Sequence, residues 1–226
     1  RICPTGALTP KSEVDEVWKV IHDPNKMVVA QIAPAVRVAL GEIFGMEPGV
    51  TTTGQTAAAL RAIGFNRVFD TSFTADLTVI EESNEFIKRN QKNEFIPQFT
   101  SCCPAWVKFV EQYYPEFVHN LSSCRSPQQM FGALSKEILA AQTGKKREDI
   151  VVVSIMPCTA KKFEAKRPEF IHDGVRDVDH VITTQELGRM IEEAGLNFKD
   201  LDPESFNLPF GFKTGAGVIF GNSGGV

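Results

Sequence analysis

The sequence predicts an α/β protein, with two lobes of mostly parallel sheet flanked by helices and the functional site between the lobes. Short apolar runs rich in β-branched residues alternate with longer stretches of helical periodicity, which is the pattern of strands joined by crossover helices. The most apolar run, residues 149–156, reads as a buried central strand. Hydrophobic residues make up 42% of the 226, enough to fill a substantial core.

Each element follows from its own local pattern. Proline stands in the first turn of several expected helices, where its missing N–H costs nothing, and glycine ends the helix that opens at Ser126-Pro127. A boundary between the lobes is expected near residues 120–150. The predicted strands are 27–32, 67–70, 95–99, 149–156 and 180–182, and the predicted helices are 12–22, 36–44, 56–63, 75–89, 104–114, 126–141 and 184–194.

Charge and hydropathy exclude several classes of partner. The net charge is -4 and the charges are mixed along the chain, so there is no basic stripe for nucleic acid or an anionic membrane. No apolar run reaches the roughly 18 residues of a spanning helix, and the first residues lack the pattern of a secretory signal. The expected location is therefore the cytoplasm, without membrane insertion.

The cysteines point to metal chemistry. Their number is odd and their spacing is not that of a disulfide framework, so ligands or reactive thiols are the better interpretation. Successive side chains of an extended segment face opposite ways, so the neighbours Cys102 and Cys103 should have different roles. A single zinc ion would prefer cysteines two to four residues apart, and ordinary buried cysteines remain the alternative. The five are Cys3, Cys102, Cys103, Cys124 and Cys158.

Three segments should converge at the carboxyl ends of the predicted strands, where ligands bind in such sheets. They are residues 33–35, 100–104 and 156–158. The sequence Thr-Ser-Cys-Cys-Pro-Ala-Trp at 100–106 resembles the first signature of iron-only hydrogenases, and Met-Pro-Cys-Thr-Ala-Lys-Lys-Phe-Glu at 156–164 resembles the second. The resemblance extends to residues 33–37 and 126–129.

This resemblance implies a cofactor and its ligands. The cofactor would be the H-cluster, a 4Fe-4S cubane joined to a di-iron subcluster that carries CO, CN and a dithiolate bridge. Cys103 and Cys158 would ligate the cubane and Cys102 would pass protons. Lys161 would donate to one cyanide, although spacing alone favours a solvated surface lysine. By the same resemblance the pocket would be formed by Ala33, Pro34, Ala35, Phe99, Gln128 and Met156.

A proton path is implied as well. Glu82 and Glu85 lie three apart on one face of the predicted helix 75–89, with Arg89 one turn further. Together with Ser122 and Cys102 they match positions of the family's path. An acidic solvated helix face is the alternative that spacing alone supports.

The implied activity is the reversible oxidation of H2 to protons and electrons. Electrons would pass through additional 4Fe-4S clusters to ferredoxin, to a flavin subunit that uses NADH, or to both, and a multi-subunit complex is one expected arrangement. The alternative is a hydrogen-sensing or iron–sulfur scaffold relative without strong turnover.

Both ends of the sequence carry further expectations. Residues 1–8 resemble the remnant of a ferredoxin-like 4Fe-4S domain in which Cys3 is a ligand, with a stray buried cysteine as the alternative. Residues 9–226 would be the N-terminal part of the catalytic domain. A third, glycine-rich signature with two more cysteines is expected beyond Gly224-Gly225, because a cubane takes four thiolates. Cys124 and the four histidines receive no role.

Overall fold

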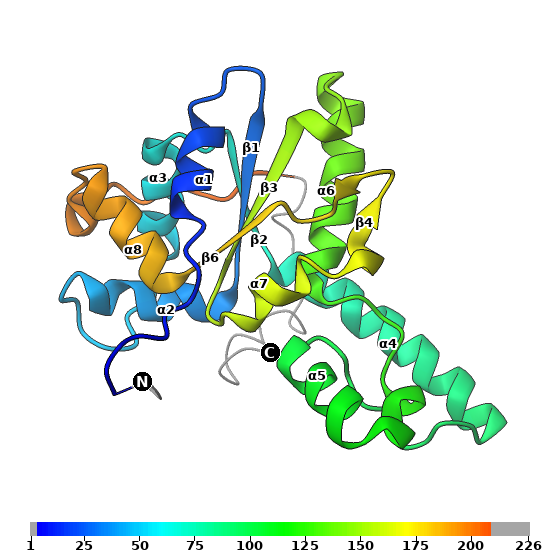
Figure 1. The fold of residues 1–226 in the computed structure, drawn as a ribbon. Coiled ribbons are helices and arrows are strands. Elements are labelled where there is room, and N and C mark those ends of the chain that lie inside the picture. Colours follow the sequence, from blue (N-terminus) through cyan, green and yellow to red (C-terminus); the bar gives the residue numbers. More distant parts are fainter. Residues whose placement is uncertain (1–3, 209–226) are drawn as a thin grey trace.

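A four-stranded parallel sheet forms the centre of the protein in a computed structural model, which describes residues 4–208 (Figure 1). Its strands are β1 (Met27–Ile32), β2 (Arg67–Asp70), β3 (Ile150–Met156) and β6 (His180–Thr183), in the order β2-β1-β3-β6. All three pairings are parallel. Every residue of β1 and β3 is buried, as expected for central strands covered on both faces. The predicted α/β class with a parallel sheet is confirmed.

Helices cover both faces of this sheet. On one side lies α6 (Pro127–Thr143), which packs against β3, and on the other lie α1 (Val14–Ile21), α3 (Thr53–Ile63) and α8 (Thr184–Glu193) (Figure 1). The apolar residues Val14 and Val17 of α1 and Leu187, Met190 and Ile191 of α8 are fully buried. The resulting layers are those of a doubly wound sheet.

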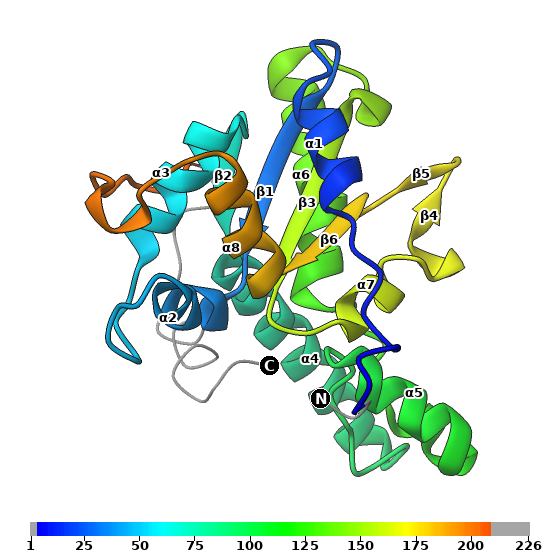
Figure 2. The same ribbon diagram turned by 60° about the vertical axis from the view of Figure 1, so that its left-hand side comes forward.

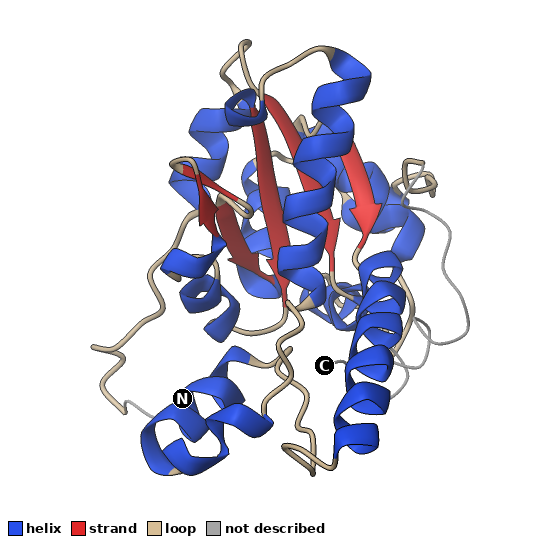
Figure 3. Cartoon of the chain, turned by 90° about the vertical axis from the view of Figure 1, so that its right-hand side faces the viewer, coloured by secondary structure: helices blue, strands red, loops and turns tan. Residues whose placement is uncertain are grey.

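The remaining helices gather beyond the carboxyl ends of the strands. The long helix α4 (Ser72–Lys92) and the helix α5 (Pro104–Tyr113) project from this end, and the short α7 (Ala160–Glu164) lies between them and the sheet (Figures 1 and 2). Figure 3 shows α4 and α5 on either side of the loops that connect them. Helix α2 (Pro34–Ile43) begins directly after β1. The 3-10 turns are Pro115–Asn120, Arg147–Asp149, Pro168–Phe170 and Phe198–Asp200.

The prediction of a strand at 95–99 was wrong. Phe95 adopts a φ of +50°, and the segment contributes only an isolated bridge between Phe99 and Leu121. Pro97 has no N–H to donate to a ladder, and proline within such a run is typical of an edge or of irregular backbone. The segment is therefore a connection that crosses α4.

Two further features concern the second half of the chain. β1 pairs with β3 across the expected lobe boundary at 120–150, so strands from both sides of it share one sheet within residues 4–208. An antiparallel hairpin, β4 (Ile171–His172) with β5 (Val175–Arg176), was not predicted. Its loop is Asp173-Gly174, both with positive φ, which is the turn chemistry of a two-residue hairpin.

Candidate functional site at the carboxyl ends of β1 and β3

The strand order creates a crevice between β1 and β3. From β1 the chain proceeds to β2 on one side, whereas β3 and β6 lie on the other, so the connections leave in opposite directions. Such a switch point is the usual ligand site of an open parallel sheet. The two strand ends stay in register, because the Ala33 N–H donates to the Ile155 carbonyl oxygen at 3.0 Å.

A cavity opens at this switch point. Six of the residues predicted for the site line it: Ala33, Pro34, Ala35, Gln128, Met156 and Lys161. Thr71, Ala75, Pro127 and Pro157 complete the lining. The walls are thus mostly apolar, with a small number of polar groups, which is the usual composition of a cofactor pocket.

Lys161 is buried at the inner wall of this cavity, with 7% of its surface exposed. Its ammonium donates to the Cys102 carbonyl oxygen at 2.6 Å and pairs with the Glu164 carboxylate at 3.1 Å. The alternative of a solvated surface lysine is therefore wrong. Glu164 was not predicted as a site residue, although its position three residues beyond Lys161 on a helix was a usable signal.

Gln128 joins the same polar group. Its amide nitrogen donates to Glu164 Oε2 at 3.0 Å and to the Lys161 carbonyl oxygen at 3.3 Å. Its Oε1 is buried and has no hydrogen-bond partner within residues 4–208. Because buried polar atoms are normally paired, this oxygen indicates a place for a polar ligand atom or a water molecule.

The two predicted thiolate ligands stand at the starts of neighbouring helices. Cys103 is the N-cap of α5, and Cys158 lies two residues before α7, which packs against α5. Both thiols are free, Cys103 half-buried and Cys158 exposed. The hydrogen bond from Lys161 on α7 to the Cys102 carbonyl ties the two loops together. Cys3 lies outside the described residues.

The predicted proton-path residues form two pairs. In the first, Thr100 connects the buried Cys102 to Glu82: its hydroxyl oxygen lies 3.7 Å from Cys102 Sγ and 2.9 Å from Glu82 Oε1. Burial raises the pKa of the Cys102 thiol, and the Thr100 hydroxyl and the charge of Lys161 oppose that shift. Thr100 was missed by the sequence analysis.

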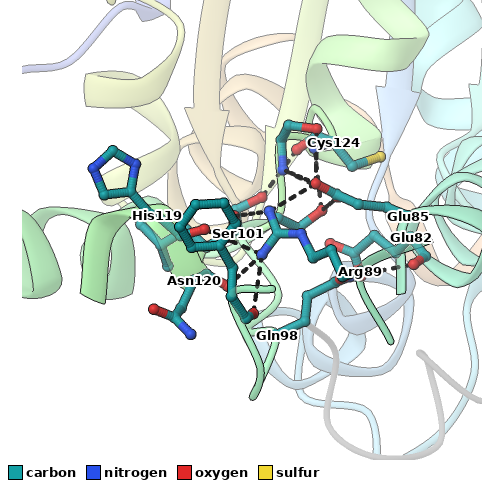
Figure 4. A network of polar contacts seen from close by, with 12 residues as sticks. Glu82, Glu85, Arg89, Gln98, Ser101, His119, Asn120 and Cys124 are labelled. Atoms are coloured by element: carbon teal, nitrogen blue, oxygen red, sulfur yellow. Dashed lines mark hydrogen bonds and ion pairs between the residues drawn. The ribbon is translucent and has the colours of Figure 1, made fainter. Parts of the chain in front are cut away.

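In the second pair the Ser122 hydroxyl donates to Glu85 at 2.6 Å. Figure 4 shows Glu85 beside Arg89, with which it forms an ion pair. Burial acts to raise the pKa of Glu85, but hydrogen bonds from Ser122, Ser123 and Arg89 outweigh it, so the pKa lies below its ordinary value. Arg89 also donates to three backbone carbonyls, at residues 119, 120 and 121. We call this set of contacts among Glu85, Arg89 and residues 119–123 the α4 network.

Several residues discussed for this site do not line the cavity, among them Phe99 and the cysteines Cys102, Cys103, Cys124 and Cys158. Phe99 packs edge-on against Trp106 and Phe117 rather than lining it. Cys124 accepts a hydrogen bond from Ser101 through its carbonyl oxygen. Burial, reinforced by Glu82, Glu81 and Glu85, raises the pKa of the Cys124 thiol to about 12, so it remains protonated.

Comparison with known proteins identifies the class to which this fold and site belong. Residues 26–226 match the family described as iron only hydrogenase large subunit, C-terminal domain. The chain therefore belongs to the iron-only hydrogenase family.

Individual relatives agree with this membership. The chain is 50% identical to the NADP-reducing hydrogenase subunit HndD of Solidesulfovibrio fructosivorans over 100% of its own length and 40% of that protein. It is 46% identical to iron hydrogenase 1 of Clostridium pasteurianum, over 99% and 39%. The cytosolic iron-sulfur assembly component 3 of Pongo abelii is 35% identical, over 88% and 44%. The chain thus spans about two fifths of the length of these relatives.

A solved structure of apo FeFe-hydrogenase from Chlamydomonas reinhardtii superposes with a TM-score of 0.83 at 44% identity, covering 91% of this chain and 53% of that one. The fold family is therefore shared over nearly the whole described region.

The residues around the cavity and on the two cysteine loops could supply part of the ligand set of an iron–sulfur cofactor. Two free thiols stand on neighbouring loops, a buried cation suits an anionic ligand, and a buried amide oxygen lacks a partner within residues 4–208. No group of three or more histidine, cysteine or acidic side chains converges there within the described residues. Two thiolates alone leave a four-cysteine cubane incomplete.

No helix within residues 4–208 is both long and apolar enough to cross a bilayer.

Proposed function

We propose that the chain is part of the catalytic domain of an FeFe-hydrogenase that reversibly oxidises H2 to protons and electrons. The observation that carries this proposal is the meeting of the two cysteine loops beside a buried lysine at the switch-point cavity. When bound, the H-cluster supplies the iron site at which hydrogen is formed or split. Cys103 and Cys158 would hold its cubane part.

The chain's own residues divide the remaining tasks. Lys161, held by Glu164, would offer a buried positive charge to the anionic cyanide ligands of the di-iron subcluster. The apolar walls at Ala33, Pro34 and Met156 would keep water away from a di-iron subcluster bound there. Cys102, Glu82, Ser122 and Glu85 would carry protons between the cavity and the surface of α4.

The electron partners are part of the same proposal. The name of the Solidesulfovibrio relative describes a subunit of an NADP-reducing hydrogenase, which supports a multi-subunit complex with a nicotinamide-linked partner. Additional 4Fe-4S clusters would connect the site to that partner or to ferredoxin. A cytoplasmic location remains a prediction, and one relative from Nitratidesulfovibrio vulgaris is named as periplasmic.

An iron–sulfur scaffold is the second candidate, supported by the assembly-component relatives. A scaffold needs no thiol for moving protons. The buried Cys102 with its link to a carboxylate therefore favours the enzyme.

Infrared spectroscopy of the full-length protein tests the proposal. Bands of metal-bound CO and CN should be present, and Cys103→Ser or Cys158→Ser should lower iron content and remove these bands. Cys124→Ser is the matched control and should retain both. Absence of CO and CN bands in the fully loaded wild type would favour the scaffold, and equal iron loss in Cys124→Ser would remove the special role of the two ligands.

A further inference from the structure

Thr100 stands between a buried thiol and a carboxylate. Its hydroxyl oxygen lies 3.7 Å from Cys102 Sγ and 2.9 and 3.0 Å from the two oxygens of Glu82. A sulfur contact of this length is within hydrogen-bonding range, and the contacts to Glu82 have ordinary hydrogen-bond lengths. One hydroxyl thus touches both groups.

The local backbone explains why position 100 can do this. In an extended segment, residues two apart face the same side, so Thr100 and Cys102 point together while Ser101 points away to the Cys124 carbonyl. The segment is fixed at both ends. The Phe99 N–H donates to the Asn120 carbonyl at 2.8 Å, and Lys161 holds the Cys102 carbonyl at 2.6 Å.

A second contact fixes the approach to α4. The side-chain amide of Gln98 donates to the Glu82 backbone carbonyl at 3.2 Å, which aligns the segment with the turn of α4 that carries the carboxylate. The Gln98 contact therefore holds the segment beside α4, so that the Thr100 hydroxyl lies within hydrogen-bonding distance of the Glu82 carboxylate.

A hydroxyl is suited to this position because it has one proton to donate and lone pairs to accept. It can give its one proton either to the Glu82 carboxylate or to the Cys102 sulfur. While it donates to Glu82, its lone pairs can accept from the Cys102 S–H. We propose that Thr100 is a positioning residue that directs the Cys102 thiol toward Glu82 and supplies the hydrogen-bond link between them.

The link is chemically balanced in both directions. A proton that leaves the thiol forms a bond to Thr100 Oγ1 while the original hydroxyl proton passes to Glu82, which becomes neutral and leaves a thiolate. The reverse transfer restores both groups. The use of this link in hydrogen turnover rests on the proposed function, whereas the hydrogen bond itself does not.

The S–H stretching band of Cys102 measures this bond directly. The full-length protein is prepared without its clusters, and the band is assigned as the one lost in Cys102→Ala. In Thr100→Val and Thr100→Ala the band should shift to higher wavenumber, because the thiol loses its acceptor. Thr100→Ser, which keeps the hydroxyl, should leave it in place, as should the neighbouring control Ser101→Ala.

The outcomes separate this proposal from the hydrogenase proposal. A band that does not move in the valine and alanine variants overturns the assignment of Thr100, and so does an equal shift in Ser101→Ala. In the loaded protein, turnover should fall by about tenfold in Thr100→Val and return in Thr100→Ser, as expected for loss of one aligned hydrogen bond. Missing CO and CN bands would defeat the hydrogenase proposal while the S–H shift still stood.

Discussion

The cavity wall and the α4 network are both polar, but they are built in different ways. Lys161, Glu164 and Gln128 are almost completely buried and are positioned by helices that begin at the end of the sheet. Glu85 and Arg89 are partly exposed and hold an irregular segment to one side of a long helix. The core of the protein fixes the side chains of the first group. The side chains of the second group instead hold the backbone of residues 119–121 in place through their own hydrogen bonds.

The difference teaches what each region can do. A buried charge that loses its partner is costly, so the cavity wall offers a stable, preformed electrostatic environment. Partly exposed groups exchange protons and solvent more readily at little structural cost. This contrast agrees with the proposed roles, in which the cavity wall holds the cofactor and the α4 network moves protons.

The largest effect is expected at the cavity wall. Glu164→Ala removes the carboxylate that pairs with Lys161 and accepts from Ser126 and Gln128, leaving a buried ammonium without its counter-charge. We expect the free energy of unfolding to fall by about 3–5 kcal/mol in chemical denaturation. The control is Glu169→Ala, a carboxylate on the surface, which should cost less than about 1 kcal/mol. Similar losses in both variants would contradict the contrast.

The next effect concerns activity rather than stability. Glu85→Gln keeps the size of the side chain but removes its ability to take up a proton from Ser122. Hydrogen turnover should fall by roughly 100-fold, the lower end of what positioned acids and bases contribute, with iron content unchanged. Glu81→Gln, on an exposed neighbouring position of α4, should leave turnover near the wild-type value. Unchanged turnover in Glu85→Gln would remove this residue from the proton path.

Two serines allow a closely matched comparison of the regions. The Ser126 hydroxyl caps α6 by accepting from the Gln129 N–H and donates to Glu164, whereas the exposed Ser123 donates to Glu85. Ser126→Ala should cost about 1 kcal/mol of unfolding free energy, the usual value of a lost N-cap. Ser123→Ala should cost less than about 0.5 kcal/mol. The reverse order would mean that the α4 network is the more strongly coupled region.

Acid should loosen the α4 network locally. The pKa of Glu85 is lower in the folded protein than its ordinary value of 4.5, so its carboxylate stabilises the fold above that pH. This contribution is lost as the pH falls through the lower, folded-state pKa. Hydrogen exchange at the Ser123 amide, which donates to Glu85, should therefore lose protection in that range.

The control for this measurement is Glu85→Gln, because its amide does not titrate. Protection of Ser123 in that variant should vary with pH only through the intrinsic exchange rate. An equal acid response in both proteins would assign the loosening to another group.

Local patterns were sufficient to predict the sheet and the cavity. Strands 27–32 and 67–70 have the predicted bounds, because short β-branched runs bounded by turns carry their own signal. The loops after β1 and β3 could then be placed from the rule that ligands bind at the carboxyl ends of parallel strands. The resemblance to the family supplied the residues themselves.

The segment 95–100 could not be predicted in the same way. Its aromatic and β-branched composition suggested a strand, but its conformation is decided by contacts with α4 and with residues 119–123, far away in the sequence. The position of Thr100 depends on that packing and so was missed. The hairpin at β4 and β5, by contrast, had a local signal in Asp173-Gly174 that was overlooked.

Prolines at the first positions of α2, α5 and α6 have a consequence for the arrival of the cofactor. Each proline restricts the preceding residue to extended backbone, and Ala33, Cys103 and Ser126 all adopt it. The backbone at these three positions around the crevice therefore has a restricted conformation whether or not a cofactor is bound. The main chain at these three positions should therefore move little when a cofactor binds.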